Sequence, residues 1–297
     1  MNAFRTAAAT SAEVANAAPL PCPACGETAE QRLRFHVNGC DILQCKACGL
    51  GRTEAAAFDP DAYYTEDYFS GRHSDGYSDY RGAEPVLRRE FARSVDFVRR
   101  FRADGRLLEL GCAYGFFLAE AAAGGFAVNG IELAQDAVEH CRRSGLDVLH
   151  GVADAANLRR IGPVDVVVLL DVIEHLPDPR ETLALCCEQL NPGGIIMITT
   201  GDFGSPAAKL TGAKWRLMTP PQHLWFFTQA SMQRMADSLG LAVEHLDRPW
   251  KIVPASLIAF QLRRMLGLRG VAAARASRLG IPINLFDAMR VVLRKPV

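Results

Sequence analysis

The sequence predicts an α/β fold built on a mostly parallel sheet, preceded by a small cysteine-bearing module. Three observations lead to this prediction. Between residues 106 and 200, short apolar runs alternate with segments of helical periodicity, as in parallel strands joined by crossover helices. The first apolar run, 107–110, passes into a turn bounded by Gly111 and Gly115 and then into an apolar helix. Two Cys-x-x-Cys pairs lie upstream of that run.

The composition is that of an ordinary globular protein. Of the 297 residues, 49% are hydrophobic and 22% are charged. The 33 basic and 33 acidic residues cancel, so no overall positive field draws the chain to nucleic acid. No apolar run reaches the roughly 18 residues that a spanning helix needs. The cysteine usage and the lack of a signal-type N-terminus favour a reducing, cytoplasmic setting.

The first 18 residues are rich in Ala, Ser, Thr and Asn without periodicity, which predicts a disordered tail over 1–18. Residues 19–54 are predicted to form a zinc ribbon. Two Cys-x-x-Cys-Gly knuckles, separated by nineteen residues, supply four thiolates: Cys22, Cys25, Cys45 and Cys48. Four thiolates complete a closed tetrahedron, so the zinc would be structural.

The stretch between the two knuckles is expected to fold as a hairpin of 31–35 and 41–44, with Cys40 and His36 outside the metal site. A ribbon raises nucleic-acid binding as a rival function. However, 19–54 holds four basic and four acidic residues and few aromatics, which makes a poor nucleic-acid platform.

Residues 55–84 are predicted to be a tyrosine-rich lid. Five of the six tyrosines lie between positions 58 and 80, among acidic residues and glycines. They are either a surface loop whose rings pack on the domain or a cover whose phenols anchor a ligand. A helix with a proline near its first turn is predicted next, over 85–101.

The glycine turn is the centre of the predicted ligand site. Glu109 lies in the strand before Gly111, and the next strand, 126–131, ends at Glu132, 21 positions after that glycine. An acid at this place can accept hydrogen bonds from two ribose hydroxyls. The N–H groups that begin the following helix, 116–123, can bind a carboxylate or phosphate.

The alternation continues with a helix over 136–143, a strand over 147–149 and the most apolar strand, 164–170. Polar residues follow this last strand at its carboxyl end, where ligands of open α/β sheets bind. They are Asp171, Glu174 and His175, and on a helical turn their spacing places them on one face.

Three ordered motifs, 109–115 with Glu132, 164–179 and 190–198, resemble those of class I S-adenosylmethionine-dependent methyltransferases; a dehydrogenase is the structural competitor. The resemblance implies a Rossmann-like seven-stranded sheet with this cofactor at its carboxyl edge. The methionyl part would lie over the glycine turn, the ribose on Glu132 and the adenine near Asp154. The residues that the resemblance assigns to the cofactor are Glu109, Gly111, Cys112, Ala113, Gly115, Glu132, Asp154 and Asp171.

A narrower resemblance, to ubiquinone-pathway O-methyltransferases, implies a divalent cation near Asp171, Glu174 and His175. The alternative is that Glu174 and His175 only bond the backbone where a helix starts. Zinc-ribbon methyltransferases of small molecules, including sugar C-methyltransferases, are also similar in arrangement.

An aromatic loop over 215–228 supplies a further candidate catalytic residue. Its Pro220, His223 and Phe227 resemble a Pro-x-x-His-x-x-x-Phe stretch of small-molecule methyltransferases. His223, with His175 beside the fourth strand, is a candidate general base for an acceptor hydroxyl. The other interpretation is a histidine that pins the loop through a backbone hydrogen bond.

The rest of the chain completes the sheet. Thr228 is expected to cap a helix over 229–239, followed by a strand over 241–246. Residues 249–283 are predicted to insert one or two helices, whose six basic residues from 251 to 278 have no acid among them. This insertion is a substrate cover, a homodimer face, a membrane-surface helix or ordinary packing. A last strand over 287–295 should lie beside the sixth, antiparallel to the rest.

The sequence therefore predicts a methyltransferase domain over 85–297 that uses S-adenosylmethionine and structural zinc. The favoured acceptor is a small molecule, methylated on a hydroxyl of a secondary metabolite, sugar or quinone-like ring. C-methylation of a nucleotide-linked sugar is the alternative. An RNA methyltransferase and a non-catalytic cofactor-binding protein are the more distant ones.

Overall fold

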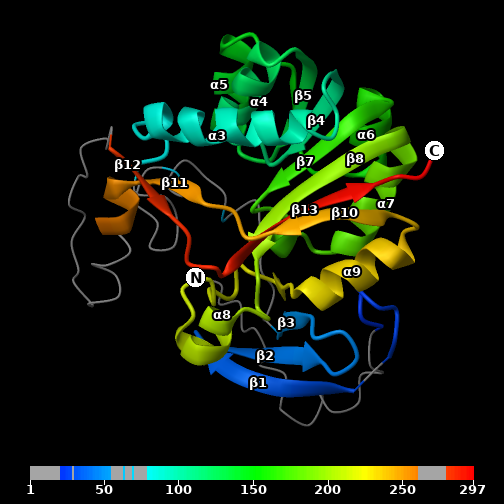
Figure 1. Ribbon diagram of the computed structural model, residues 1–297, viewed down its shortest axis with the longest axis vertical. Coiled ribbons are helices and arrows are strands. Elements are labelled where there is room, and N and C mark those ends of the chain that lie inside the picture. The colour runs from blue at the N-terminus through cyan, green and yellow to red at the C-terminus, as the bar shows by residue number, and fades with distance from the viewer. Residues whose placement is uncertain (1–20, 29, 55–62, 64–68, 70–78, 260–278) are drawn as a thin grey trace, which may run out of the picture.

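The computed structural model describes residues 21–28, 30–54, 63, 69, 79–259 and 279–297 (Figure 1). The predicted tail, 1–18, and most of the predicted lid, 55–84, lie outside the described residues. No helix in the described part of the chain has the length and apolarity to cross a bilayer.

The centre of the molecule is a seven-stranded sheet in the order β10-β13-β8-β7-β4-β5-β6 (Figure 1). Its strands are β4 (Gly105–Leu110), β5 (Phe126–Glu132), β6 (Val148–His150), β7 (Val164–Leu170), β8 (Leu190–Gly201), β10 (Ala242–Asp247) and β13 (Ala288–Arg294). All neighbours from β6 to β8 pair in parallel, whereas β13 pairs antiparallel with both β8 and β10. The predicted fold class is confirmed, including the antiparallel last strand.

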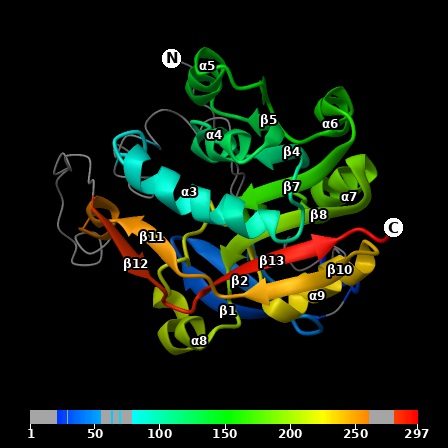
Figure 2. The same ribbon diagram turned by 45° about the horizontal axis from the view of Figure 1, so that its top comes forward.

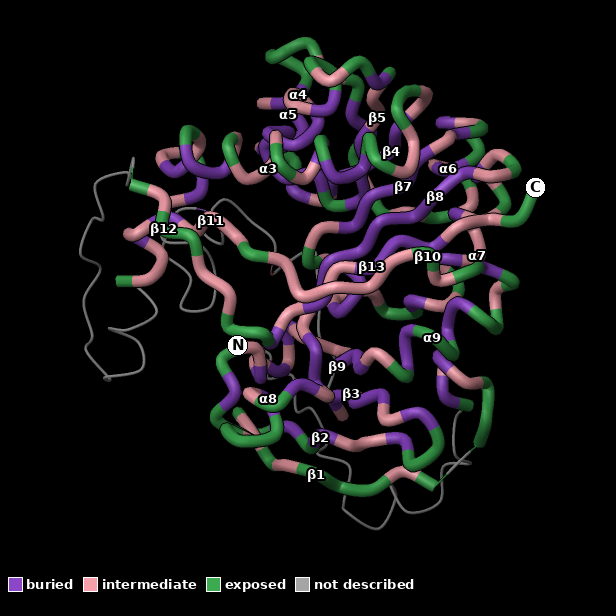
Figure 3. Tube along the Cα trace, in the orientation of Figure 1, coloured by how far each residue is buried: buried purple, intermediate pink, exposed green. Residues whose placement is uncertain are grey.

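Helices cover both faces of this sheet (Figure 2). On one face, α3 (Glu84–Arg99), α4 (Phe116–Ala123) and α5 (Gln135–Arg143) pack on the strands. On the other face lie α6 (Ala155–Ile161), α7 (Pro179–Gln189) and α9 (Gln229–Ser238). Strands β7 and β8 are buried along most of their length (Figure 3), which is why their sequences are nearly continuous apolar runs.

The cysteine module forms a second sheet, β1 (Gln31–Val37), β2 (Cys40–Cys45) and β3 (Gly51–Glu54). Its fourth strand, β9 (Trp225–Phe226), comes from the aromatic loop far along the chain and pairs antiparallel with β3. The knuckle cysteines also share one apolar core with α7 and α9. The ribbon is thus built into the core of the main sheet by backbone pairing as well as by side-chain packing.

The insertion over 249–283 differs from the predicted helices at both ends. It begins with β11 (Lys251–Pro254) and ends with β12 (Gly280–Ile283), which pair antiparallel. Residues 255–259 are helical, and 260–278 lie outside the described residues. The β-branched residues Ile252, Val253 and Ile281 favour the extended backbone of these two paired strands. Pro254 has no backbone N–H to donate, which is consistent with the end of β11 at this residue.

Candidate functional site

The glycine turn after β4 has the backbone shape that the sequence predicts. Gly111 and Gly115 have φ values of +66° and +74°, a region that side chains disfavour. A Cβ on Gly111 would come within 2.7 Å of Val172 Cγ2, and one on Gly115 within 2.6 Å of Leu146 Cδ1. Both positions therefore exclude any larger residue for two independent reasons.

Glu132 fastens the turn to the end of β5. One carboxylate oxygen accepts the Ala113 N–H at 2.7 Å, and the other accepts the N–H groups of Leu133 and Ala134, each at 2.8 Å. Burial raises the pKa of Glu132, although these three amide donors oppose the shift. The predicted ribose ligand thus also orients the loop that would cradle the cofactor.

Glu109 is a buried acceptor that still lacks a donor. Its side chain is 3% exposed, and Oε2 has no hydrogen-bond partner within the described residues. Burial raises the pKa of this carboxyl well above its usual range, and the neighbouring Cys141 and Glu132 add to the rise. A ligand that brings a cationic or N–H donor to this point would satisfy it, and the ammonium group of S-adenosylmethionine is such a donor.

Asp154, the predicted adenine ligand, is the N-cap of α6. Its Oδ1 accepts the N–H groups of Ala156 and Asn157 at 3.0 and 2.8 Å. The structure thus gives this acid a local structural role, and its contact with adenine stays a prediction.

Three aromatic residues of the predicted lid are described, and two of them, Phe69 and Tyr80, pack beside the glycine turn. Tyr80 stacks on Phe116 with ring centroids 5.5 Å apart, and Phe69 meets Tyr114 edge to face at 5.3 Å. Phe69 and Tyr80 are 7% and 6% exposed. These two rings therefore help to fix the turn from outside the sheet.

Asp171 follows β7 with φ of +56° and lies against a residue that the sequence did not indicate. Lys251 Nζ, at the start of β11, contacts both carboxylate oxygens at 2.7 and 3.1 Å. The hydroxyl of Thr199 donates to Oδ1 at 2.9 Å. Desolvation opposes ionisation, but the Lys251 ammonium outweighs it and holds the pKa of Asp171 below its usual range.

Three side chains at the carboxyl edge lie close enough to share one metal ion. Glu174 and His175 come from the 3₁₀ turn after β7, and His223 comes from the aromatic loop. One ligand atom of each lies within 4.8 Å of the others. The two imidazole rings meet edge to face, with centroids 4.7 Å apart. The structure thus groups His223 with Glu174 and His175, while Asp171 pairs with Lys251.

The electrostatics of this cluster (Glu174, His175 and His223) favour neutral groups. Glu174 is 4% exposed with no partner for Oε2 within the described residues, and burial next to Asp171 raises its pKa to about 8. Burial lowers the pKa of His175 and, together with His175, lowers that of His223 well below its usual range. The neutral imidazoles can accept a proton from an acceptor hydroxyl. The imidazoles can also bind a cation together with the Glu174 carboxylate, once that group has lost its proton.

A backbone contact sets the orientation of His175, and further hydrogen bonds hold the aromatic loop beside it. His175 Nδ1 lies 2.8 Å from the carbonyl oxygen of Gln222, which assigns the N–H to Nδ1 and the acceptor lone pair to Nε2. Gln222 in turn accepts a 2.8 Å hydrogen bond from Tyr63, another tyrosine of the predicted lid. The Leu224 N–H donates to the carbonyl oxygen of Glu174 at 2.9 Å, which ties the aromatic loop to the turn after β7.

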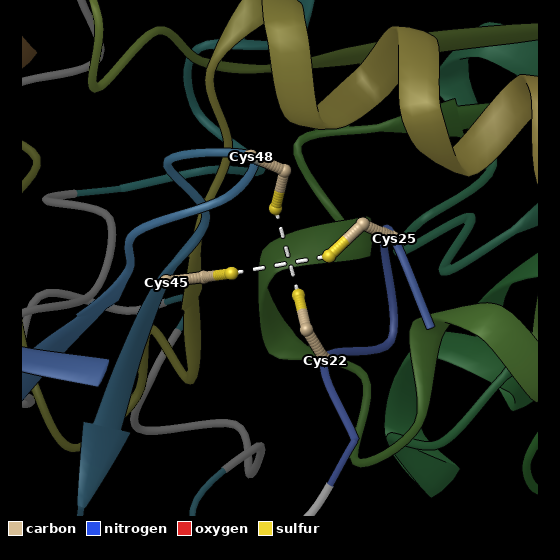
Figure 4. A group of neighbouring side chains, drawn as sticks. All are labelled: Cys22, Cys25, Cys45 and Cys48. Atoms are coloured by element: carbon tan, nitrogen blue, oxygen red, sulfur yellow. Dashed lines mark hydrogen bonds between the residues drawn. The ribbon is translucent and has the colours of Figure 1, made fainter. Parts of the chain in front are cut away.

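The four knuckle cysteines form a separate cluster in which the thiols converge on one point (Figure 4). The Sγ atoms of Cys22 and Cys48 are 3.5 Å apart, and those of Cys25 and Cys45 are 3.9 Å apart. A tetrahedral zinc with bonds of about 2.3 Å would place sulfur atoms about 3.8 Å apart, so the geometry fits. Cys40 and His36 lie outside the cluster; His36 bonds Asp41 at 2.8 Å.

Comparison with known proteins agrees with this architecture. A family described as a methyltransferase domain matches residues 84–246. A ubiquinone biosynthesis O-methyltransferase of Caulobacter vibrioides is 32% identical over 48% of this chain and 65% of its own length. One from Methylococcus capsulatus is 30% identical over 60% of this chain and 81% of its own. An S-adenosylmethionine-dependent methyltransferase of Archaeoglobus fulgidus superposes with a TM-score of 0.51 and 17% identity over 76% of this chain and 98% of its own. The chain therefore belongs to the methyltransferase-domain family, and its fold is that of an S-adenosylmethionine-dependent methyltransferase.

Proposed function

We propose that this chain transfers a methyl group from S-adenosylmethionine to a hydroxyl of a small-molecule acceptor. The observation that carries the proposal is the cluster of Glu174, His175 and His223 at the carboxyl edge of the sheet. A hydroxyl must lose its proton as it is methylated, and this cluster offers groups that can take or displace that proton. The two ubiquinone O-methyltransferases compared above support the choice of an oxygen acceptor.

The residues of the glycine turn fit the cofactor. Glu109 would accept from the methionyl ammonium, since its Oε2 is a buried acceptor without a donor in the described chain. Glu132 would accept from the ribose hydroxyls while it keeps Ala113 in place. When bound, the cofactor supplies a methyl group on a sulfonium, which is an electrophile for in-line displacement. The protein's task is therefore to align the acceptor and manage its proton.

Two arrangements of the cluster would achieve this. In the first, a neutral imidazole, His223 or His175, receives the acceptor proton directly. In the second, the cluster holds a divalent cation that lowers the acceptor's pKa. The ligand set of one carboxylate and two imidazoles suits zinc, manganese or iron(II) better than magnesium, which prefers oxygen. The convergence of one ligand atom from each of the three residues within 4.8 Å supports the second arrangement.

The test is product analysis with the zinc-loaded full chain. Methyl-labelled S-adenosylmethionine would be incubated with catechol, hydroxyquinol and sugar acceptors, and the product bond assigned by NMR. A methyl ether supports the proposal, whereas a new carbon–methyl bond would replace it with C-methylation. His223→Ala should lower kcat far more than it weakens cofactor binding, measured by calorimetry. Failure of the folded protein to bind either S-adenosylmethionine or S-adenosylhomocysteine would overturn the assignment altogether.

A further inference from the structure

A cavity lies where the ribbon meets the methyltransferase core, lined by residues of β1, the short helix α8 (Pro206–Thr211) and the start of α9. Figure 1 shows where these three elements lie. Its volume is about 410 Å³. None of the residues of the glycine turn or of the Glu174 cluster lines it. Its charged lining consists of Arg32, Arg34, Asp202, Lys209 and Arg248.

The charges in this groove do not balance. Asp202 is 1% exposed and holds Arg248 at 2.6 Å, so these two neutralise each other. Arg32 bonds only the neutral amide of Gln44, at 2.9 Å, and Arg34 lies over the Phe35 ring, 5.5 Å from its centroid. Within the part of the chain that the structure describes, Arg32, Arg34 and Lys209 form no ion pair. Three positive charges therefore face one cavity without a counter-charge among the described residues.

Backbone donors add to this positive potential. The capping box of α9 joins Thr228 and Ser231 and leaves the N–H groups of Gln229 and Ala230, which line the groove, without partners in the described chain. The helix has ten residues, so its N-terminal end carries a partial positive charge. Guanidinium groups, an ammonium and amide N–H groups together form the donor set that phosphate oxygens prefer.

A wall of aromatic rings separates the groove from the methyl-transfer site. Phe203 lines the groove and packs on Phe226 with centroids 5.6 Å apart. The Phe226 ring in turn lies 6.2 Å from the ring of His223, centroid to centroid. A ligand in the groove would thus contact the aromatic loop from behind without entering the site of chemistry.

We infer that this groove binds the phosphate group of a small molecule, at a site distinct from that of methyl transfer. Arg34, Lys209 and the first N–H groups of α9 are the proposed ligands. The volume suits a molecule of metabolite size, since ligand cavities typically measure about 300–1,000 Å³. An extended nucleic acid is disfavoured because the ribbon as a whole, 19–54, has four acidic residues against four basic ones.

The experiment is calorimetric titration of the zinc-loaded full chain with inorganic pyrophosphate. The double variant Arg34→Ala/Lys209→Ala removes two ligands. Both side chains are exposed, so folding should be unaffected. The matched control is Arg159→Ala/Arg160→Ala, which removes two equally exposed charges from the end of α6, outside the groove. Titration with S-adenosylhomocysteine reports separately on the cofactor site.

We expect pyrophosphate to bind, the groove variant to lose at least about tenfold in affinity, and the control to retain it. Binding of S-adenosylhomocysteine should be equal in all three proteins. No heat up to about 10 mM pyrophosphate, or equal binding by the groove variant, would overturn the inference. Binding of poly-glutamate in place of pyrophosphate would also overturn it and would identify an acidic protein surface as the occupant.

Discussion

The hydroxyl of Thr53 donates a 2.6 Å hydrogen bond to the carbonyl oxygen of His223. This contact joins the last strand of the ribbon to the residue whose imidazole belongs to the Glu174 cluster. A second hydrogen bond between the same two segments reinforces this contact, since the Thr53 N–H donates to the Leu224 carbonyl oxygen at 2.9 Å. The ribbon therefore positions the aromatic loop, and zinc at the four cysteines would stabilise the ribbon from the other end.

Thr53→Val should lower kcat by about fivefold, the rate equivalent of one lost hydrogen bond of about 1 kcal/mol. Valine keeps the shape but leaves the His223 carbonyl without its donor. The affinity for S-adenosylmethionine should not change, because the glycine turn is elsewhere. Thr53→Ser is the control and should retain activity. Steady-state kinetics with calorimetry would show this, and equal loss in both variants would contradict the positioning role.

Metal content distinguishes the two clusters. After incubation with zinc or manganese and removal of excess ion, we expect the wild-type chain to hold zinc at the four cysteines and a second divalent ion at Glu174, His175 and His223. The double variant Glu174→Gln/His223→Ala should lose the second ion only. Elemental analysis measures both. A wild-type protein that retains zinc at the cysteines alone would leave direct proton transfer to histidine as the mechanism.

Glu109→Gln should change the stability of the protein and its affinity for S-adenosylmethionine in opposite directions. Burial raises the folded-state pKa of Glu109, so its stabilising contribution is complete below its unfolded pKa, near 4.5, and is lost as the pH rises toward the folded value. The slope is at most about 1.4 kcal/mol per pH unit for one proton. The neutral amide of glutamine would remove this pH dependence, so the variant should be more stable than wild type at pH 8. It should also bind S-adenosylmethionine more weakly, because the amide lacks the negative charge that would attract the methionyl ammonium.

Urea unfolding at several pH values, without ligand, tests the stability half of this prediction. Glu120→Gln is a suitable control, because Glu120 lies on α4, close to the turn, and is not fully buried. A slope that is unchanged in Glu109→Gln would show that another buried acid is responsible.

Lys251→Met should weaken binding of the acceptor more than it lowers the stability of the fold. The ion pair with Asp171 is partly exposed, with 30% and 44% of the two side chains accessible, so its loss should cost less than about 1 kcal/mol. Lys251 lowers the pKa of Asp171, so its stabilisation is present above the unfolded pKa and disappears as the pH falls through the folded one. Wild type and variant should therefore differ in stability at pH 7 and converge as the pH falls below the folded-state pKa of Asp171.

The kinetic signature of Lys251→Met is a raised KM for the acceptor, because β11 would lose its contact with Asp171 at the carboxyl edge of the sheet. Lys251→Arg preserves the charge and should restore the wild-type KM. Unchanged KM in Lys251→Met would separate the insertion from the acceptor site.

The parts of the fold that the sequence predicted depend on local signals. Alternating apolar runs and helical periodicity indicated the strands from β4 to β8, and two Cys-x-x-Cys pairs indicated the ribbon. At the glycine turn, a strained backbone needs particular residues, so the positions of Gly111 and Gly115 could be recognised directly.

The parts that it did not predict depend on pairing between distant segments. Strand β9 has two residues and exists only because β3 offers it an edge, so no local pattern marks it. The contact of Lys251 with Asp171 spans 80 positions. His223 was a candidate base from its loop motif alone, whereas its proximity to Glu174 depends on the tertiary fold. The short strands of the insertion were interpreted as helix because basic and apolar residues are mixed there.

The position of β13 has a consequence for synthesis of the chain. This strand lies between β8 and β10 but is made after both, so the two cannot share a finished sheet while the ribosome is still translating residues before 288. Until then each presents an open edge with unpaired N–H and C=O groups, a state prone to association with other chains. Completion of the seven-stranded sheet therefore requires β13 to insert between two strands that are synthesised before it.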